Sequence, residues 1–273
     1  MSVAADDQRA RRASPAAPFV EIDGLHKSFG ANHVLRGVDL RIDRGEVYTL
    51  LGGSGSGKSV LLKHMIGLLR ADAGRVRVDG TDVTGYSEAQ WIDVRRGIGY
   101  VFQGAALFDS LSVYENLAYP LREHEKWEEA RIAARVAECL EAVGLPGIER
   151  RMPAELSGGM RKRIGVARAI AQQPSAILYD EPSTGLDPGN SRRIARLIRS
   201  LQDRLQATSV VVTHDLSLCY EVSDRVALLE DGRVAQHGSM DELESGALPR
   251  VAAFLEGEGE EAGIAPGEDA HDG

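Results

Sequence analysis

The glycine-rich segment Gly52–Ser59, with the sequence GGSGSGKS, has the composition of a phosphate-binding loop. It fits the pattern G-x-x-x-x-G-K-[ST] in full, follows the apolar stretch Val47–Leu51 and opens a helical pattern. Backbone N–H groups in such a loop surround a phosphate, and the helix N-terminus adds its positive dipole end. Lys58 would bridge β- and γ-phosphate oxygens, and the Ser59 hydroxyl would bind Mg²⁺. The predicted nucleotide contacts are Gly52, Gly53, Ser54, Gly55, Ser56, Gly57, Lys58, Ser59 and Val60.

Two carboxylates and a histidine follow apolar runs further along the chain. Asp180 and Glu181 end the run that starts at Ala176, and His214 follows the run Ser209–Thr213. An Asp at the end of such a strand holds Mg²⁺ in proteins with a phosphate-binding loop. The adjacent Glu181 points to the other side and is placed to deprotonate an attacking water. A His at the carboxyl end of a strand faces the crevice where ligands bind in open α/β sheets. Together these residues predict hydrolysis of a nucleoside triphosphate.

The segment Leu156–Gly159, called the LSGG segment below, predicts a second phosphate-recognition surface. Ser157 and the amides of Gly158 and Gly159 would form another anion-binding helix N-terminus. Three basic residues, Arg161 to Arg163, come directly after it, although positive charge in a first helical turn opposes the helix dipole. Two interpretations stay open for these residues: a solvated helix face, or charge that contacts a triphosphate or a partner.

The elements that must position these residues alternate between strand and helix. Strands alternating with helices predict a mainly parallel sheet covered on both faces. The turn Asp231-Gly232 between Val226–Glu230 and Arg233–Ala235 predicts a hairpin. The other expected strands are Phe19–Asp23, Val34–Ile42, Val47–Leu51, Val76–Val78, Ile98–Phe102, Ala176–Tyr179 and Ser209–Val212, and the expected helices are Ser59–Leu69, Met160–Ala171 and Ser191–Leu205.

The segment from about 105 to 152 differs from this alternation and predicts a helical insertion. The stretch Lys126–Val143 is strongly charged, and its apolar residues recur at spacings of four, four and three, which places them on one helical face. Gly144 would end this helix. The apolar residues concerned are Ile132, Val136, Leu140 and Val143.

Composition and charge narrow the class of protein. The chain has 273 residues, a net charge of −9, and no apolar stretch near the roughly 20 residues of a membrane-spanning helix. Residues 256–273 carry seven carboxylates and residues 1–18 have a net charge of +1, which leaves −3 for the rest. This nearly neutral body argues against binding to nucleic acid. We expect residues 1–18 to be a disordered leader without a secretory signal. Residues 256–273 would form a flexible acidic tail, either solubilising or contacting a partner. Cys139 and Cys219 are expected to be core residues of a reduced protein.

Three further features complete a set of motifs in chain order. Phe29 precedes the phosphate-binding loop, Gln103 follows a predicted strand, and the segment 183–187 (STGLD) follows Glu181. With the LSGG segment, this set resembles that of ATP-binding cassette (ABC) ATPases over about residues 19 to 255. The resemblance implies an α/β P-loop NTPase (RecA-like) fold. This fold has a mainly parallel sheet core, an antiparallel β subdomain and an inserted helical subdomain.

The resemblance also implies ATP and Mg²⁺ as ligands and gives a role to each motif. Phe29 would stack on adenine, and His214 would contact the γ-phosphate and position water. Gln103 would touch both Mg²⁺ and water, joining Ser59 and Asp180 as a metal ligand. The LSGG segment would face the phosphate-binding loop of a second copy, so that two ATP molecules lie between the subunits of a homodimer, with residues 183–187 at the seam.

Longer stretches resemble one branch of this superfamily, the MlaF-like ATPases of MCE-type lipid transport. They are LSGGMRKR at 156–163, SVLLKHMIGLL at 59–69 and VFQGAALFDSLSVYEN at 101–116. This resemblance implies an integral MlaE-like permease partner, which residues 105–116 would contact. It also implies an MCE-domain lipid-binding subunit and a place at the cytoplasmic face of the inner membrane. Gly53 departs from the family, where Pro is common. The alternatives are an importer of amino acids or other small solutes, and a soluble ABC ATPase without a transport role.

Overall fold

The computed structural model describes residues 17–125 and 127–257. Its larger sheet has the strand order β10-β9-β3-β8-β7-β6, in which all neighbours are parallel except β9 and β10. Every residue of β3, β7 and β8 is buried, as the apolar runs of a sheet covered on both faces require. The bounds are β3 Val47–Leu51, β6 Ile98–Val101, β7 Ala176–Asp180, β8 Thr208–Val212, β9 Arg225–Glu230 and β10 Arg233–Ser239.

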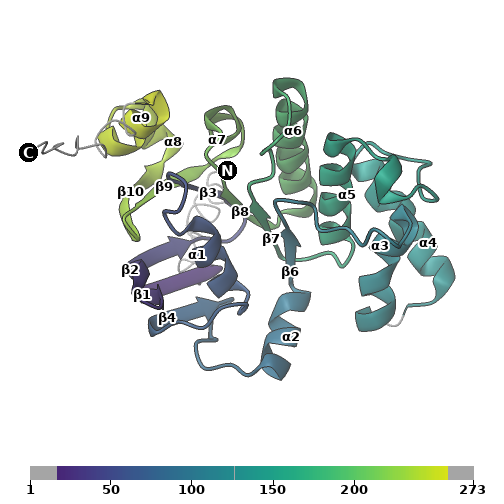
Figure 1. Ribbon diagram of the computed structural model, residues 1–273, viewed down its shortest axis with the longest axis horizontal. Helices are drawn as coiled ribbons and strands as arrows, with labels where there is room; N and C mark the ends of the chain where they lie inside the picture. The colour runs from purple at the N-terminus through teal and green to yellow at the C-terminus, as the bar shows by residue number, and fades with distance from the viewer. Residues whose placement is uncertain (1–16, 126, 258–273) are drawn as a thin grey trace, which may run out of the picture.

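A smaller antiparallel sheet with the order β2-β1-β4-β5 packs beside the larger one. Figure 1 shows helix α1 between the two sheets. The predicted strand at Phe19–Asp23 is only the first part of β1, which continues to Phe29 and pairs with β2 through several register shifts. The bounds are β1 Val20–Phe29, β2 Asn32–Ile42, β4 Ala73–Val78 and β5 Thr81–Asp82.

Two main apolar clusters cover the two faces of the larger sheet, because neighbouring residues of a strand point to opposite faces. On β7, Ile177 and Tyr179 pack with helices α5, α6 and α7, whereas Ala176 and Leu178 pack with α1 and the antiparallel sheet. The helices around the sheet are α1 Lys58–Met65, α2 Glu88–Arg96, α5 Gly158–Ile170, α6 Pro188–Leu205, α7 Leu216–Val222, α8 Met240–Glu244 and α9 Pro249–Glu256.

The helical segment lies at one end of the molecule, beside α5 and opposite α9 (Figure 1). It contains α3 Val113–Pro120, a π-helical turn at Leu121–Glu125 and α4 Glu129–Ala142, followed by a 3-10 turn at Pro153–Glu155. The predicted apolar face of α4 is confirmed: its members are buried in the cluster that also holds the apolar residues of α5. Gly144 follows the helix with a φ of 66°.

Helix α1 is shorter than predicted, and α2 had no sequence prediction. Gly67 has a φ of 65°, and a Cβ there would lie 2.1 Å from the ring of Trp91. The chain therefore turns at Gly67, and the Leu68 N–H donates to Lys63 O at 2.9 Å, which ends the helix at Met65 rather than Leu69. Trp91 is the buried residue of α2, so one apolar side chain anchors this otherwise polar helix.

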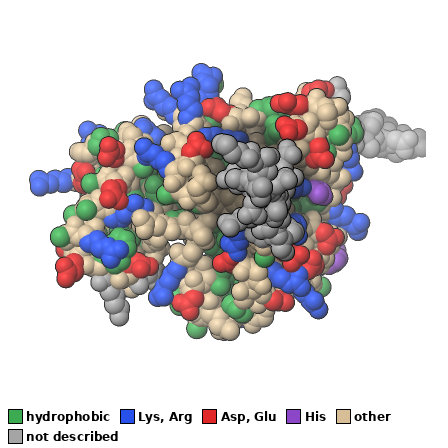
Figure 2. Space-filling model, turned by 180° about the vertical axis from the view of Figure 1, so that it is seen from behind, with side chains coloured by type: hydrophobic (Ala, Val, Ile, Leu, Met, Phe, Trp, Pro, Cys, Tyr) green, Lys and Arg blue, Asp and Glu red, His purple; other side chains and the backbone are tan. Residues whose placement is uncertain are grey.

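The hairpin of β9 and β10 is confirmed, with Asp231 and Gly232 at positive φ. Cys139 and Cys219 are free and buried, as expected. None of the described helices is long and apolar enough to cross a membrane. On the face seen in Figure 2, acidic and basic side chains are interspersed. Glu256, the first residue of the predicted acidic tail, ends helix α9. Residues 258–273 of this tail and residues 1–16 of the predicted leader lie outside the described residues.

Candidate nucleotide site

The phosphate-binding loop turns sharply between β3 and α1. Gly52 has a φ of 150°, and a Cβ at this position would lie 2.4 Å from Leu229 O and 2.7 Å from Ser56 Oγ. A side chain at residue 52 is therefore excluded both by the backbone and by the neighbouring strand β9. The turn of the loop at this position therefore requires glycine.

A pocket of ≈ 700 Å³ opens in front of this loop. Most of the predicted site residues line it, and they come from β1, α1 and the carboxyl ends of β3, β6, β7 and β8. The carboxyl edge of a parallel sheet is the usual place for a ligand in such folds. The lining residues are Phe29, Val34, Gly53, Ser54, Gly55, Gly57, Lys58, Ser59, Val60, Gln103, Glu181, His214, Leu216, Phe254 and Gly257.

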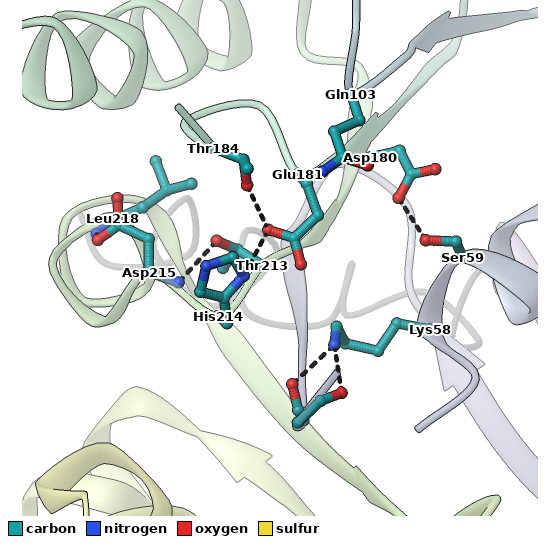
Figure 3. A network of polar contacts seen from close by, with 12 residues as sticks. Lys58, Ser59, Gln103, Asp180, Glu181, Thr184, Thr213, His214, Asp215 and Leu218 are labelled. Atoms are coloured by element: carbon teal, nitrogen blue, oxygen red, sulfur yellow. Dashed lines mark hydrogen bonds and ion pairs between the residues drawn. The ribbon is translucent and has the colours of Figure 1, made fainter. Parts of the chain in front are cut away.

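Lys58 is buried and lies across the loop (Figure 3). Its Nζ donates to Gly52 O at 2.7 Å and to Gly53 O at 2.9 Å. Burial lowers the pKa of the ammonium from its ordinary value, and the carboxylates of Glu181 and Asp180 oppose this shift. The cation is thus held beside the loop by two carbonyl groups, with two carboxylates nearby.

Asp180 accepts hydrogen bonds at both carboxylate oxygens. Ser59 Oγ donates to Oδ1 at 2.7 Å (Figure 3), and Tyr100 Oη donates to Oδ2 at 3.0 Å. Burial, the Asp180 charge and this hydrogen bond raise the pKa of Tyr100, so its hydroxyl stays a donor. Ser59 and Asp180 bring two hard oxygen ligands together beside the phosphate-binding loop, which suits Mg²⁺ bound through few protein groups and the phosphates of a nucleotide. These residues fit the predicted metal.

Glu181 directs its carboxylate into the same pocket from the end of β7. Its φ is 50°, and its N–H donates to Val212 O at 3.0 Å. Thr184 Oγ1 donates to Oε2 at 3.0 Å, and His214 Nδ1 lies 2.9 Å from the same oxygen (Figure 3). Among the described residues, these side-chain contacts involve Oε2 alone, so Oε1 stays available to accept a proton.

The loop that carries His214 is fixed by its neighbour Asp215. The Asp215 carboxylate accepts from Leu218 N at 3.1 Å, which caps α7, and from Ser191 Oγ of α6 at 2.6 Å. Burial raises the pKa of Asp215, but these hydrogen bonds outweigh burial and the pKa is lowered. The Asp215 N–H donates to Thr213 Oγ1 at 2.9 Å (Figure 3). His214 itself is largely exposed at the pocket, with 60% of its side chain accessible.

The LSGG segment lies elsewhere. Ser157 caps α5 by accepting from Met160 N at 3.3 Å, and Ser157 and Gly158 are exposed. Gly159 is buried against Asn190 of α6. None of these three predicted contacts is among the described residues that line the pocket. Within one chain, the structure therefore does not bring the LSGG segment to the phosphate-binding loop.

The basic residues after the LSGG segment bind backbone carbonyl groups. Arg161 donates to Leu156 O at 2.7 Å, and Arg163 donates to Val143 O and Gly144 O at 3.2 and 3.3 Å. Lys162 is 8% exposed and donates to the backbone carbonyls of Gln103 and Glu181. A solvated face therefore does not describe Lys162, and its ammonium is held by carbonyl groups within this chain.

The sequence pattern of the ABC transporter family matches residues 35–184. The chain belongs to the ABC transporter family. It is 42% identical over 243 residues to a probable ribonucleotide transport ATP-binding protein, mkl, of Mycobacterium leprae, covering 89% of this chain and 70% of that protein. It is 45% identical over 227 residues to the sulfate/thiosulfate import ATP-binding protein CysA of Xylella fastidiosa, covering 82% and 64%.

Solved ABC cassettes have the same fold. The cassette MJ0796, in a dimeric post-hydrolysis state bound to ADP and Pi, has a TM-score of 0.75 and 31% identity, covering 81% of this chain and 98% of that one. The protein cbiO1 of Clostridium perfringens, part of the transporter complex cbiONQ, has a TM-score of 0.78 and 30% identity, covering 88% and 99%. The predicted P-loop fold is confirmed. This ABC protein is an ATPase that binds ATP together with Mg²⁺.

Several residues of this ABC site had no sequence prediction. The predicted adenine partner Phe29 is 48% exposed at the pocket. Three further apolar residues that were not predicted line the pocket with it: Val34, Leu216 and Phe254. The sequence contains no motif that would place Phe254, because α9 reaches the pocket only through the tertiary fold. Tyr100 was not predicted either, because its hydroxyl reaches Asp180 only through the parallel pairing of β6 with β7.

Proposed function

We propose that the chain is the ATP-hydrolysing subunit of a membrane transporter and that it works as a homodimer around two ATP molecules. The observation that carries this proposal is the separation of two phosphate-recognition surfaces on one chain. The loop, Glu181 and His214 line the pocket, and Asp180 adjoins it through the hydrogen bond from Ser59. The LSGG residues 157–159 are not among the described residues that line it. A two-fold arrangement of identical subunits completes such a site, because each subunit then supplies the half that the other lacks.

In this proposal the backbone amides of Gly53 to Gly57 and the Lys58 ammonium bind the phosphates, and Phe29 binds the base. Ser59 and Asp180, together with Gln103, would hold Mg²⁺, whose charge helps to neutralise the phosphate oxygens. These residues fix where the γ-phosphate lies relative to Glu181.

Glu181 then takes the proton of the attacking water at Oε1, while Thr184 and His214 keep the carboxylate in place through Oε2. His214 is exposed at the pocket and would contact the γ-phosphate through its other ring nitrogen. The amides at Ser157 and Gly159 of the second subunit would bind the γ-phosphate from the opposite side.

The substitution Glu181→Gln tests this assignment. We expect ATP turnover to fall by roughly 10²- to 10⁴-fold. ATP binding should persist, and a dimer should accumulate with ATP during size-exclusion chromatography. The substitution Glu244→Gln, at an exposed carboxylate of α8, is the matched control and should leave turnover unchanged. Wild-type turnover in the Glu181→Gln protein would refute Glu181 as the base.

The permease contact is proposed at an aromatic groove of ≈ 340 Å³ lined by Phe102, Phe108, Tyr119, Pro120 and Arg168. The rings of Phe108 and Tyr119 are 5.7 Å apart, and both side chains are nearly half exposed. Exposed aromatic residues that meet in one groove suit the insertion of a helix from another protein. The groove adjoins the Gln103 loop (residues 102–106), so a bound helix would touch a segment that also lines the ATP pocket.

Co-purification from membranes tests this surface. We expect Tyr119→Asp to abolish association with a co-expressed permease and to leave ATP turnover of the isolated chain within about twofold, because Tyr119 lies outside the pocket. Tyr220→Asp, at a similarly exposed aromatic residue of α7, is the control and should keep the association. Equal association of both variants would refute the groove as the docking site.

For the cargo we propose phospholipid or another lipid, moved between the inner and outer membranes from the cytoplasmic face of the inner membrane. The support is the resemblance of LSGGMRKR and of residues 101–116 to MlaF-like ATPases. An MlaE-like permease and an MCE-domain subunit would be the partners. An importer of small solutes is the second candidate, and the similarity to sulfate/thiosulfate importers favours it.

Purification of the membrane complex expressed from the neighbouring genes separates the two candidates. A lipid transporter should contain an MCE-domain subunit and co-purify with phospholipid detectable by mass spectrometry. A complex with a soluble solute-binding subunit and no bound lipid would contradict the lipid proposal and support the importer.

A further inference from the structure

Helix α5 contacts the catalytic site at a place other than the LSGG segment. One turn beyond its N-terminus, Lys162 is buried and donates to Gln103 O and, at 3.2 Å, to Glu181 O. These carbonyls belong to two different segments, the loop after β6 and the residue that ends β7. A single buried ammonium therefore joins α5 to the backbones of Gln103 and Glu181, two residues that line the pocket.

The same helix holds the rest of the Gln103 loop. Arg168 donates to Ala106 O at 2.8 Å and to Ala105 O at 3.0 Å, and both alanines have positive φ. At Gly165 the two backbones approach so closely that a Cβ would lie 3.3 Å from Ala105 Cα. The loop is thus bound along nearly two turns of α5, and the cations on this helix fix its conformation.

Burial lowers the pKa of the Lys162 ammonium, whereas the carboxylates of Glu181 and Asp180 raise it. Charge-assisted hydrogen bonds of a buried cation are strong, and a buried carbonyl that loses its donor carries a desolvation cost. A displacement of α5 relative to β7 would break these bonds unless Gln103 and Glu181 moved with the helix.

We infer that Lys162 is a positioning residue for ATP hydrolysis, which holds the backbones of Gln103 and Glu181 in register with α5. This inference rests on the proposed roles of Gln103 and Glu181 and extends them to the helix that carries the LSGG segment. Through Lys162, the position of α5 in a dimer sets the position of the catalytic carboxylate. Lys162 does not contact the nucleotide in this scheme, so its effect appears in turnover and not in ATP binding.

Comparison of Lys162→Met with Arg163→Met tests the inference. Both substitutions remove a cation that donates to two carbonyls from neighbouring positions of α5, but Arg163 contacts Val143 and Gly144, remote from the pocket. We expect Lys162→Met to lower kcat by roughly 10- to 100-fold through misplacement of the base. KM and the Kd of a fluorescent ATP analogue should stay within about twofold. Arg163→Met should keep kcat within about twofold of wild type. Its decrease in Tm should be similar to that of Lys162→Met.

A conservative exchange supplies a second readout, which also applies if Lys162→Met does not fold. Lys162→Arg keeps a cation with several donors and should restore most of the wild-type kcat, whereas Lys162→Gln, with one amide, should give an intermediate kcat. Equal kcat values for Lys162→Met and Arg163→Met would overturn the inference, as would a Lys162→Gln kcat equal to wild type. These outcomes are independent of Glu181→Gln, whose wild-type turnover would instead refute the proposed base.

Discussion

The phosphate-binding loop and the LSGG segment are both glycine-rich N-termini of helices, but their surroundings differ. The loop opens α1 inside the pocket, where Lys58, Asp180 and Glu181 converge around it. The LSGG segment opens α5 at an exposed site, with Ser157 as its cap. Two sequences with the same local chemistry therefore lie in different surroundings, and in the proposed homodimer the second would meet a phosphate only when another subunit supplies it.

The largest expected effect comes from the phosphate-binding loop. Lys58→Ala removes the cation that we propose binds the phosphates, and ATP turnover should fall by more than about 100-fold. Binding of a fluorescent ATP analogue to the monomer should weaken as well. Isothermal titration with ATP and Mg²⁺ measures this. Unchanged binding would show that the pocket in front of the loop is not the nucleotide site.

A substitution in the LSGG segment should separate binding from turnover. Ser157→Arg places a long side chain where the partner's ATP would lie, so turnover should fall by about 100-fold while the monomer binds ATP within about twofold of wild type. Ser239→Arg, which removes the equivalent cap of α8, is the control for loss of a helix cap and should keep turnover. Weakened ATP binding by the monomeric Ser157→Arg protein would contradict the comparison.

A smaller effect should appear at Tyr100, whose hydroxyl donates to Oδ2 of Asp180, the carboxylate oxygen that Ser59 does not contact. Tyr100→Phe should raise the Mg²⁺ concentration needed for half-maximal ATP binding roughly tenfold, as loss of a partner that orients a metal ligand does. Tyr179→Phe removes a buried hydroxyl from the neighbouring strand β7 and should leave this value unchanged. Electron paramagnetic resonance during titration with Mn²⁺ measures the metal affinity of both variants directly and does not depend on ATP hydrolysis. Equal metal affinity in both variants would contradict a role for the Tyr100 hydroxyl.

The smallest effect concerns stability. His64 of α1 is buried, and burial lowers its pKa from the ordinary value of 6.5. Below that value the unfolded chain binds a proton that the folded chain resists, so the free energy of unfolding falls as pH decreases from about 7.5 to about 5.5. Urea denaturation should show a flatter pH dependence for His64→Gln than for wild type. The exposed His237→Gln should retain the wild-type slope, and an unchanged slope in His64→Gln would refute the assignment.

Local sequence patterns were sufficient wherever a motif and its strand or helix are adjacent in the chain. The pattern G-x-x-x-x-G-K-S after an apolar strand predicted a loop that opens a helix, and Lys58 and Ser59 line the pocket in the structure. The strand ends placed Glu181 and His214 on the same edge, because parallel strands share their carboxyl edge. The apolar spacing of α4 predicted its buried face.

Contacts between distant segments were beyond these patterns. The close approach of Trp91 to Gly67, where the chain turns after α1, joins two separate segments, and no local pattern predicts it. The basic triplet could not be interpreted from sequence because its partners are backbone carbonyls, which carry no residue-specific signal. Lys162 lies 59 residues from Gln103 and 19 from Glu181 in the chain, and the packing of α5 against β6 brings the three together.

The central claim is that one chain carries two incomplete halves of an ATP site. Subunit complementation tests it most directly. Lys58→Ala chains keep an intact LSGG segment, Ser157→Arg chains keep an intact phosphate-binding loop, and a mixed dimer contains one site with both halves intact. We predict that the two inactive proteins, mixed with ATP and Mg²⁺, hydrolyse ATP well above the sum of their separate rates, with a maximum near equal amounts. A rate equal to that sum at every ratio would contradict the composite site.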